Sequence, residues 1–170
     1  MDETELLIRD LCARAYNDTI VDVAYWVSYD GKPELEWSKE KLTLSLLHQI
    51  EEEEGAWGFI KPYLRPLSSM TKEEAEEMFH LMYPNDKLIK VELEQNFVRF
   101  TRLVGGESFQ GILTLFFNKI YSLEQLDWYY SKHFDVRDLI GKNLAIEVNK
   151  ENNPYEKIDM VCWLKENGKI

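Results

Sequence analysis

TIVDVAYWVSYDGKPELEWS, residues 19–38, is the stretch of sequence that decides the fold class. Its first half, from Thr19 to Tyr29, is rich in β-branched and aromatic residues, which favour a strand. The residues DGKP at 30–33 supply turn chemistry, and Leu35 and Trp37 alternate with polar residues beyond them. The segment therefore predicts an antiparallel β-hairpin.

Helical and strand patterns continue on both sides of this hairpin. Leu7, Leu11 and Ala15 form an apolar stripe that predicts a helix over residues 4–16, with Cys12 buried on the stripe and Arg14 off it. Thr71 and Glu74 form a capping box that predicts the start of another helix. Further helices are expected at 123–132 and 135–140, and further strands at 35–38, 42–47, 89–93, 97–103, 109–121, 144–148 and 161–164. For 109–121 a buried helical turn is the alternative, because periodicity does not separate the two.

These patterns predict an α+β fold: small antiparallel β-sheets or a partly open barrel, with three to four short helices. A chain of 170 residues with 45% hydrophobic residues has material for one core rather than two. We therefore expect a single domain over 1–170, which can divide into a β-rich N-terminal subdomain (1–66) and an α+β C-terminal subdomain (67–170).

Charge is unevenly distributed along the chain. The formal net charge is -11; residues 1–85 hold 18 acidic and 8 basic residues, whereas residues 86–170 hold 13 and 12. A negative surface repels phosphate backbones and disfavours direct nucleic-acid binding. No apolar stretch is long enough to cross a bilayer, and the N-terminus lacks the pattern of a signal peptide. Cys12 and Cys162 form no CxxC motif, so we expect reduced thiols and a cytoplasmic location.

The densest group of chemically active residues is Asp127, His133, Asp135 and Arg137. A histidine between carboxylates can act as a general acid or base, because a carboxylate orients the ring and raises its pKa. The alternative is structural: Asp135 caps the second helix, His133 bonds to a local carbonyl, and Arg137 pairs with an acid. These four residues are the candidate catalytic site.

A second candidate site would hold an anion through Lys61, Arg65, Ser69 and Thr71, because helix N-termini offer free N–H groups. Helix capping explains the same residues. The glutamates at 51–54 lack the spacing of a calcium loop and read as an exposed loop, and the three histidines are scattered. Without a phosphate-binding or dinucleotide-binding motif, the sequence predicts no cofactor and no metal.

Three blocks carry a resemblance to a known family: residues 6–14 (LLIRDLCAR), 60–71 (IKPYLRPLSSMT) and 127–147, which contains HFD at 133–135. Together they resemble a family of small uncharacterised proteins found in gut Bacteroidales, their prophages and crAss-like phages. The chain differs from the family pattern at residues 16–19 and at Lys132, Val136 and Asp138. The resemblance implies a phage or prophage context and no particular mechanism.

The function favoured by these observations is a non-catalytic phage or prophage accessory protein. Its acidic N-terminal half, with Trp26, Trp37 and Trp57, would bind another protein of basic character. Mimicry of nucleic acid is a special case of this hypothesis. The alternative is a small enzyme that acts on a phosphorylated or nucleotide-like substrate through Asp127, His133, Asp135 and Arg137. The sequence leaves the oligomeric state open.

Overall fold

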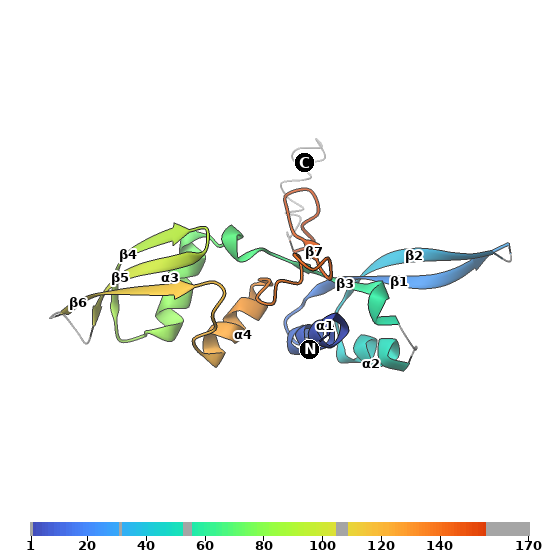
Figure 1. The fold of residues 1–170 in the computed structure, drawn as a ribbon, viewed down its shortest axis with the longest axis horizontal. Coiled ribbons are helices and arrows are strands. Elements are labelled where there is room, and N and C mark those ends of the chain that lie inside the picture. Colours follow the sequence, from blue (N-terminus) through green and yellow to red (C-terminus); the bar gives the residue numbers. More distant parts are fainter. Residues whose placement is uncertain (1, 31, 53–55, 105–108, 156–170) are drawn as a thin grey trace, which may run out of the picture.

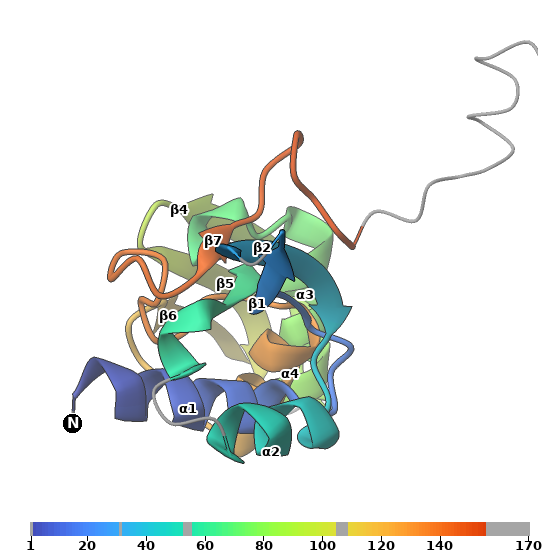
Figure 2. The ribbon, with the colours of Figure 1, turned by 90° about the vertical axis from the view of Figure 1, so that its right-hand side faces the viewer.

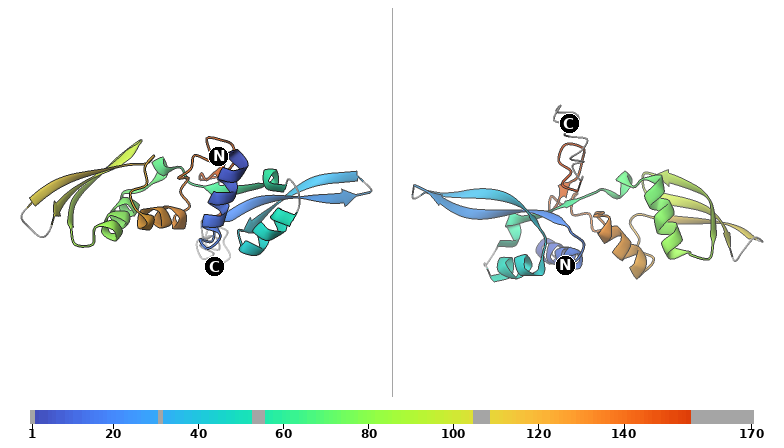
Figure 3. Two further views of the ribbon diagram at one scale, coloured as in Figure 1. Left: turned by 60° about the horizontal axis from the view of Figure 1, so that its bottom comes forward. Right: turned by 180° about the vertical axis from the view of Figure 1, so that it is seen from behind.

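The computed structural model describes residues 2–30, 32–52, 56–104 and 109–155. The molecule is elongated, with one lobe at each end of its long axis (Figures 1 and 3). The described part contains four α-helices and two sheets, which confirms the predicted α+β class. No helix in these ranges is long and apolar enough to cross a membrane. The strand predicted at 161–164 and the predicted loop residues 53–54 lie outside the described residues.

The N-terminal lobe is a sheet with two helices against one face. Its elements are α1 (Glu3–Arg14), β1 (Ile20–Tyr29), β2 (Lys32–Lys41), α2 (Leu44–Glu52), the 3₁₀ helix η1 (Ala56–Phe59), β3 (Ile60–Leu64) and β7 (Ile146–Glu147). The strand order is β2-β1-β3-β7, with only β7 parallel to its neighbour. Leu11 of α1, Ile50 of α2 and Val21 of β1 belong to one buried core. Seen from the hairpin end, α1 and α2 lie on the same side of the sheet (Figure 2).

The predicted hairpin is confirmed, and most of it extends beyond the lobe. β1 and β2 pair from Ile20–Lys41 to Tyr29–Lys32, whereas β3 pairs with β1 only at residues 21–23. Residues 24–29 and 32–37 therefore form a two-stranded ribbon without a third strand, which we name the hairpin arm. It projects along the long axis at one end of the molecule (Figure 1).

The C-terminal lobe is an antiparallel sheet packed against two helices. It consists of the 3₁₀ helix η2 (Leu67–Ser69), α3 (Lys72–Met82), β4 (Lys87–Glu94), β5 (Phe97–Val104), β6 (Phe109–Phe116) and α4 (Leu123–Ser131), with strand order β4-β5-β6. Its core includes Phe79, Phe100 and Trp128. The capping box of Thr71 and Glu74 is present in both directions. The strand predicted at 109–121 is confirmed over Phe109–Phe116 only.

The strand predicted at 42–47 is wrong, because this segment enters α2. Alternating leucines suggested a period of two, but the buried residues are Leu46, Leu47 and Ile50, which lie on one face of a helix. The Thr43 hydroxyl accepts a hydrogen bond from the Leu46 amide at 3.1 Å and starts that helix.

The helix predicted at 135–140 is also absent, since this segment forms turns. Asp138 has a φ of 59°, a left-handed conformation that a right-handed helix cannot include. The strand predicted at 144–148 contracts to β7, Ile146–Glu147. Leu139 and Ala145, just before it, pack in the core of the N-terminal lobe, so the chain returns to that lobe after α4.

Two residues of α1 have the opposite burial from that predicted. Cys12 is exposed rather than buried. Arg14, expected off the apolar stripe, is fully buried together with Asp10. The buried side of α1 therefore includes an ion pair beside Leu7 and Leu11, and Cys12 lies on the other side.

Candidate functional site

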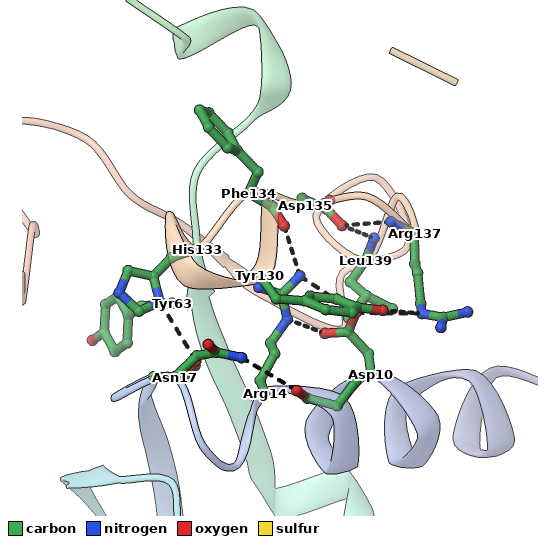
Figure 4. A network of polar contacts seen from close by, with 12 residues as sticks. Asp10, Arg14, Asn17, Tyr63, Tyr130, His133, Phe134, Asp135, Arg137 and Leu139 are labelled. Carbon is green, nitrogen blue, oxygen red and sulfur yellow. Dashed lines mark hydrogen bonds and ion pairs between the residues drawn. The ribbon is translucent and has the colours of Figure 1, made fainter. Parts of the chain in front are cut away.

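The two lobes meet at a buried polar network, which we name the lobe junction (Figure 4). It is formed by Asp10, Arg14, Tyr130, Phe134, Asp135 and Arg137. Arg65, which follows β3, pairs with Phe134 as an isolated parallel bridge, with Arg65 N to His133 O and Asp135 N to Arg65 O both at 2.8 Å. The three sequence blocks that carry the family resemblance thus converge here.

Arg14 is the centre of the junction. Its Nε donates to Asp10 Oδ2 at 2.5 Å and its Nη2 donates to the Phe134 carbonyl at 2.6 Å. The guanidinium lies over the Tyr130 ring, 4.6 Å from its centroid, and Nη1 is buried with no hydrogen-bond partner among the described residues. Burial raises the pKa of Asp10, while the Arg14 and Arg137 guanidiniums oppose that shift. The pair therefore fixes α1 of the first lobe to the chain that leaves α4 of the second.

Arg137 shares the Asp10 carboxylate with Arg14. Its Nε lies 3.5 Å from Asp10 Oδ1 and donates a hydrogen bond to the Tyr130 hydroxyl at 3.1 Å. The terminal nitrogens of Arg137 point away from this contact (Figure 4), and no described residue is bonded to them.

Asp135 caps the turns that replace the expected helix. Its carboxylate accepts hydrogen bonds from the amides of Arg137 at 3.3 Å, Leu139 at 2.9 Å and Ile140 at 2.8 Å. These bonds use both oxygens, which is the capping role given as the alternative for this residue. Asp127 is exposed on α4, and among the described residues it has no contact with His133, Asp135 or Arg137. The structure does not bring the four candidate residues together around one reacting atom.

His133 is held in an environment that keeps it neutral. Its backbone has a φ of 61°, its ring is stacked on Tyr155 with centroids 3.8 Å apart, and Nδ1 lies 3.5 Å from the Thr19 hydroxyl. Burial, followed by the positive charges of Arg14 and Arg65, lowers the pKa of His133 to about 4. This is opposite to the raised pKa expected for a histidine between carboxylates. At neutral pH the ring is an uncharged part of the scaffold.

The four candidate anion-binding residues are each occupied by contacts within the fold. Arg65 donates to both oxygens of Glu74, at 2.6 and 2.9 Å, and lies over the Phe134 ring. Burial alone would raise the pKa of Glu74, but the hydrogen bonds from Arg65 and Thr71 lower it. Thr71 is the N-cap of α3, and Lys61 contacts the Asn143 side chain at 3.3 Å. Ser69 lies in η2, where its amide bonds to Pro66 and its carbonyl accepts from Arg65.

A groove of about 1060 Å³ lies beside the junction. It runs between the segment after β3 and the two strand ends of the C-terminal sheet, and its lining includes Leu67, Asn96, Phe116, Asn118 and Arg137. The wall combines apolar surface with amide side chains, one guanidinium and the carboxylates of Asp135 and Asp138. Among the described residues, no three His, Cys, Asp or Glu side chains come together as a metal site.

The hairpin arm has two chemically different faces, as the strand register shows. Ala24 pairs with Trp37 and Trp26 pairs with Leu35, so these side chains share one face. Trp26 is 66% exposed and Trp37 is 49% exposed. This aromatic face continues through Phe59, whose ring meets the edge of Trp26 at 6.3 Å.

The opposite face of the arm is acidic. Glu34 and Glu36 pair with Val27 and Tyr25, and Glu40, at the base of the arm, pairs with Val21 on the same side. Lys32 lies at the tip of this face. Because Val21 packs in the core with Ile50 of α2, the acidic face lies on the side of the sheet where α2 ends at Glu51 and Glu52. The structure thus places five carboxylates of the first half on one side of the N-terminal lobe.

No protein family model, curated protein or solved structure matches this chain. The functional argument therefore depends on the geometry of the chain itself. Sequence reasoning missed the buried Asp10–Arg14 pair. Its sequence signal is the i, i+4 spacing of opposite charges adjacent to Leu7 and Leu11, which places the pair beside the apolar stripe of α1.

Proposed function

We propose that this protein is a non-catalytic binding protein that contacts a basic protein partner through the hairpin arm of its acidic N-terminal half. The observation that carries the proposal is the division of the arm into an aromatic face, with Trp26 and Trp37, and an acidic face, with Glu34 and Glu36. The resemblance to a phage and prophage family supports an accessory protein whose partner is a host or phage protein.

The arm is not needed to close the core of its lobe. Along β2, Leu35 and Glu40 are half-buried and the other residues are exposed. After Val23, β1 is no longer paired with β3. Apart from the contact between Trp26 and Phe59, much of the surface of Trp26 and Trp37 is left exposed by the fold, and a partner would cover it. Tryptophan is among the residues enriched in the hot spots of protein interfaces.

The acidic face defines the charge of the partner. Glu34, Glu36 and Glu40 lie an even number of residues apart along β2, so their side chains are on one side of the ribbon, with Ser38 between the last two. Such a row attracts lysine and arginine side chains and speeds encounter with a basic surface, an effect that salt weakens. A phosphate-bearing partner would be repelled.

The enzyme hypothesis has less support from the geometry. The Asp135 carboxylate accepts hydrogen bonds from backbone amides through both oxygens, and the ring of His133 is stacked on Tyr155. Asp127 is exposed on α4, away from the other three candidate residues. The terminal nitrogens of Arg137 remain free among the described residues, but an arginine is always charged and cannot transfer a proton. The candidate cluster is therefore better explained as a structural junction.

The test is affinity capture from a host lysate at low and high salt, with four forms of the protein. These are the wild type, Trp26→Ser with Trp37→Ser, Glu34→Lys with Glu36→Lys, and the control Leu123→Ser. Leu123 is 75% exposed on α4 in the other lobe, so the control also removes an exposed apolar side chain.

We expect a stoichiometric basic protein to be retained by the wild type and the control. The tryptophan variant should lose it at both salt concentrations, and the lysine variant should lose it most clearly at low salt. Equal retention by all four forms, or no partner at either salt concentration, would contradict the proposed function.

A further inference from the structure

The two edge strands of the C-terminal sheet, β4 and β6, differ in how they are protected. β4 carries Lys87, Lys90, Glu92 and Glu94, and a bulge interrupts its register between Leu88 and Lys90. Charges and bulges are the usual devices that prevent an edge strand from pairing with another chain. β6, with the sequence FQGILTLF, has no charged residue, no proline and no break in its register. One edge is protected and the other is not.

The backbone of β6 offers a free row of hydrogen-bonding groups. The Phe117 amide donates to the Asn96 carbonyl, so the backbone groups of Phe117 point toward β5. In an antiparallel pair, the backbone groups of every second residue of β6 before Phe117 also bond to β5. The alternate residue Phe116 points its amide outward, where the Tyr121 hydroxyl accepts it at 3.2 Å. The outward positions that remain are Gln110, Ile112 and Thr114. No strand of the described chain lies beyond them.

The side chains next to this row are apolar and exposed. Ile112 is 72% exposed and Phe116 is 43% exposed. Both lie on the face of the sheet opposite Leu115, which is buried against the helices. Phe97 of β5 meets the Phe116 ring at 5.8 Å on the same outer face. A strand added to β6 would therefore cover apolar surface as well as satisfy backbone groups.

We propose that β6 pairs antiparallel with β6 of a second copy of this chain, which joins the two sheets into one six-stranded sheet. Antiparallel pairing of identical strands is isologous, so the same surface meets itself and the assembly closes as a dimer. The fit to a second copy follows from charge. β6 carries no charged residue, so it meets its copy without repulsion between the two paired strands.

The geometry also keeps the acidic parts of the two copies apart. β6 runs close to the long axis of the molecule, and the hairpin arm lies at the opposite end (Figure 1). Antiparallel pairing therefore directs the two bodies in opposite directions, with one arm at each end of the dimer. If the arms bind a partner as proposed above, the dimer is bivalent and gains affinity for partners that carry two sites.

The test is sedimentation equilibrium of the purified full chain over a wide concentration range. The wild type is compared with Ile112→Lys on β6 and with the matched control Ile89→Lys on β4, whose isoleucine is 51% exposed. Both changes put a lysine at an exposed position of an edge strand, and circular dichroism verifies that each variant is folded. No partner protein is present, so the result is independent of the proposed function of the arm.

We expect the wild type and Ile89→Lys to sediment at twice the chain mass of 20.2 kDa, and Ile112→Lys at the chain mass itself. A wild type that is monomeric at every concentration, as when β6 accepts only a strand of another protein, would overturn the proposal. So would an Ile112→Lys variant that remains dimeric, or assembly that continues beyond two copies.

Discussion

Replacement of Arg14 by methionine tests the lobe junction most severely. The change leaves the Asp10 carboxylate, which is 0% exposed, with only the Nε of Arg137 at 3.5 Å, and leaves the Phe134 carbonyl without its donor. Removal of one partner from a buried ion pair costs about 3–5 kcal/mol, because the remaining charge stays buried. We expect the free energy of unfolding of Arg14→Met to fall by this amount.

The loss in the free energy of unfolding of Arg14→Met is compared with the losses in two further variants. Arg9→Met removes an arginine of the same helix whose ion pair with Glu5, at 2.7 Å, is exposed; such pairs contribute about 0.5 kcal/mol or less. Asp10→Leu combined with Arg14→Met removes both buried charges, and we expect it to cost about 2 kcal/mol or less. The double variant should thus be more stable than Arg14→Met alone.

The assay is urea unfolding followed by far-ultraviolet circular dichroism and by tryptophan fluorescence, with coincident transitions as the check of two-state behaviour. A loss of less than about 1 kcal/mol in Arg14→Met would refute the reasoning, because it would mean that water reaches the Asp10 carboxylate. A double variant less stable than Arg14→Met would refute it as well.

Two further predictions concern the scaffold around the junction. Because the pKa of His133 is lowered to about 4 in the folded chain, protonation favours the unfolded chain, and stability should be lost as pH falls from 6.5 to 4. After allowance for partial exposure of the ring, this loss is about 1–2 kcal/mol. It should be absent from His133→Asn, because an asparagine tolerates the φ of 61° at this position. Equal pH profiles of the free energy of unfolding in urea for the two proteins would contradict the prediction. Thr71→Ala removes the acceptor of the Glu74 amide at 3.2 Å and should lower the free energy of unfolding by about 1 kcal/mol, whereas the control Lys72→Ala should change it by about 0.5 kcal/mol or less. A Thr71→Ala variant as stable as that control would show that the capping box contributes nothing.

Local signals account for the parts of the fold that the sequence predicts. The hairpin at residues 19–38 combines β-branched residues with a turn, and α3 has its capping box within four residues. The strand prediction for 42–47 was wrong because a short run with leucines at alternate positions fits a strand and a helix equally. Only Ile50, further along the chain, indicates the buried face of the helix.

The junction could not be predicted because its contacts are distant in sequence. Arg14 and the Phe134 carbonyl are 120 residues apart, and the sequence places Arg14 outside the apolar stripe of α1. Its burial depends on the second lobe, which supplies the carbonyl and the Tyr130 ring. The role of Asp135 as a cap was anticipated as an alternative, but the left-handed turn at Asp138 gives no clear signal in the sequence.

The central claim is that the hairpin arm is the surface that meets a partner, and hydrogen exchange of the complex tests it most directly. Backbone amides of the hairpin arm, at residues 24–29, 32 and 34–37, are compared in the free chain and in the complex with the captured protein. The proposed function predicts that exchange slows in the arm and stays unchanged along the groove at residues 135–141. Slower exchange at the groove with an unchanged arm would contradict it.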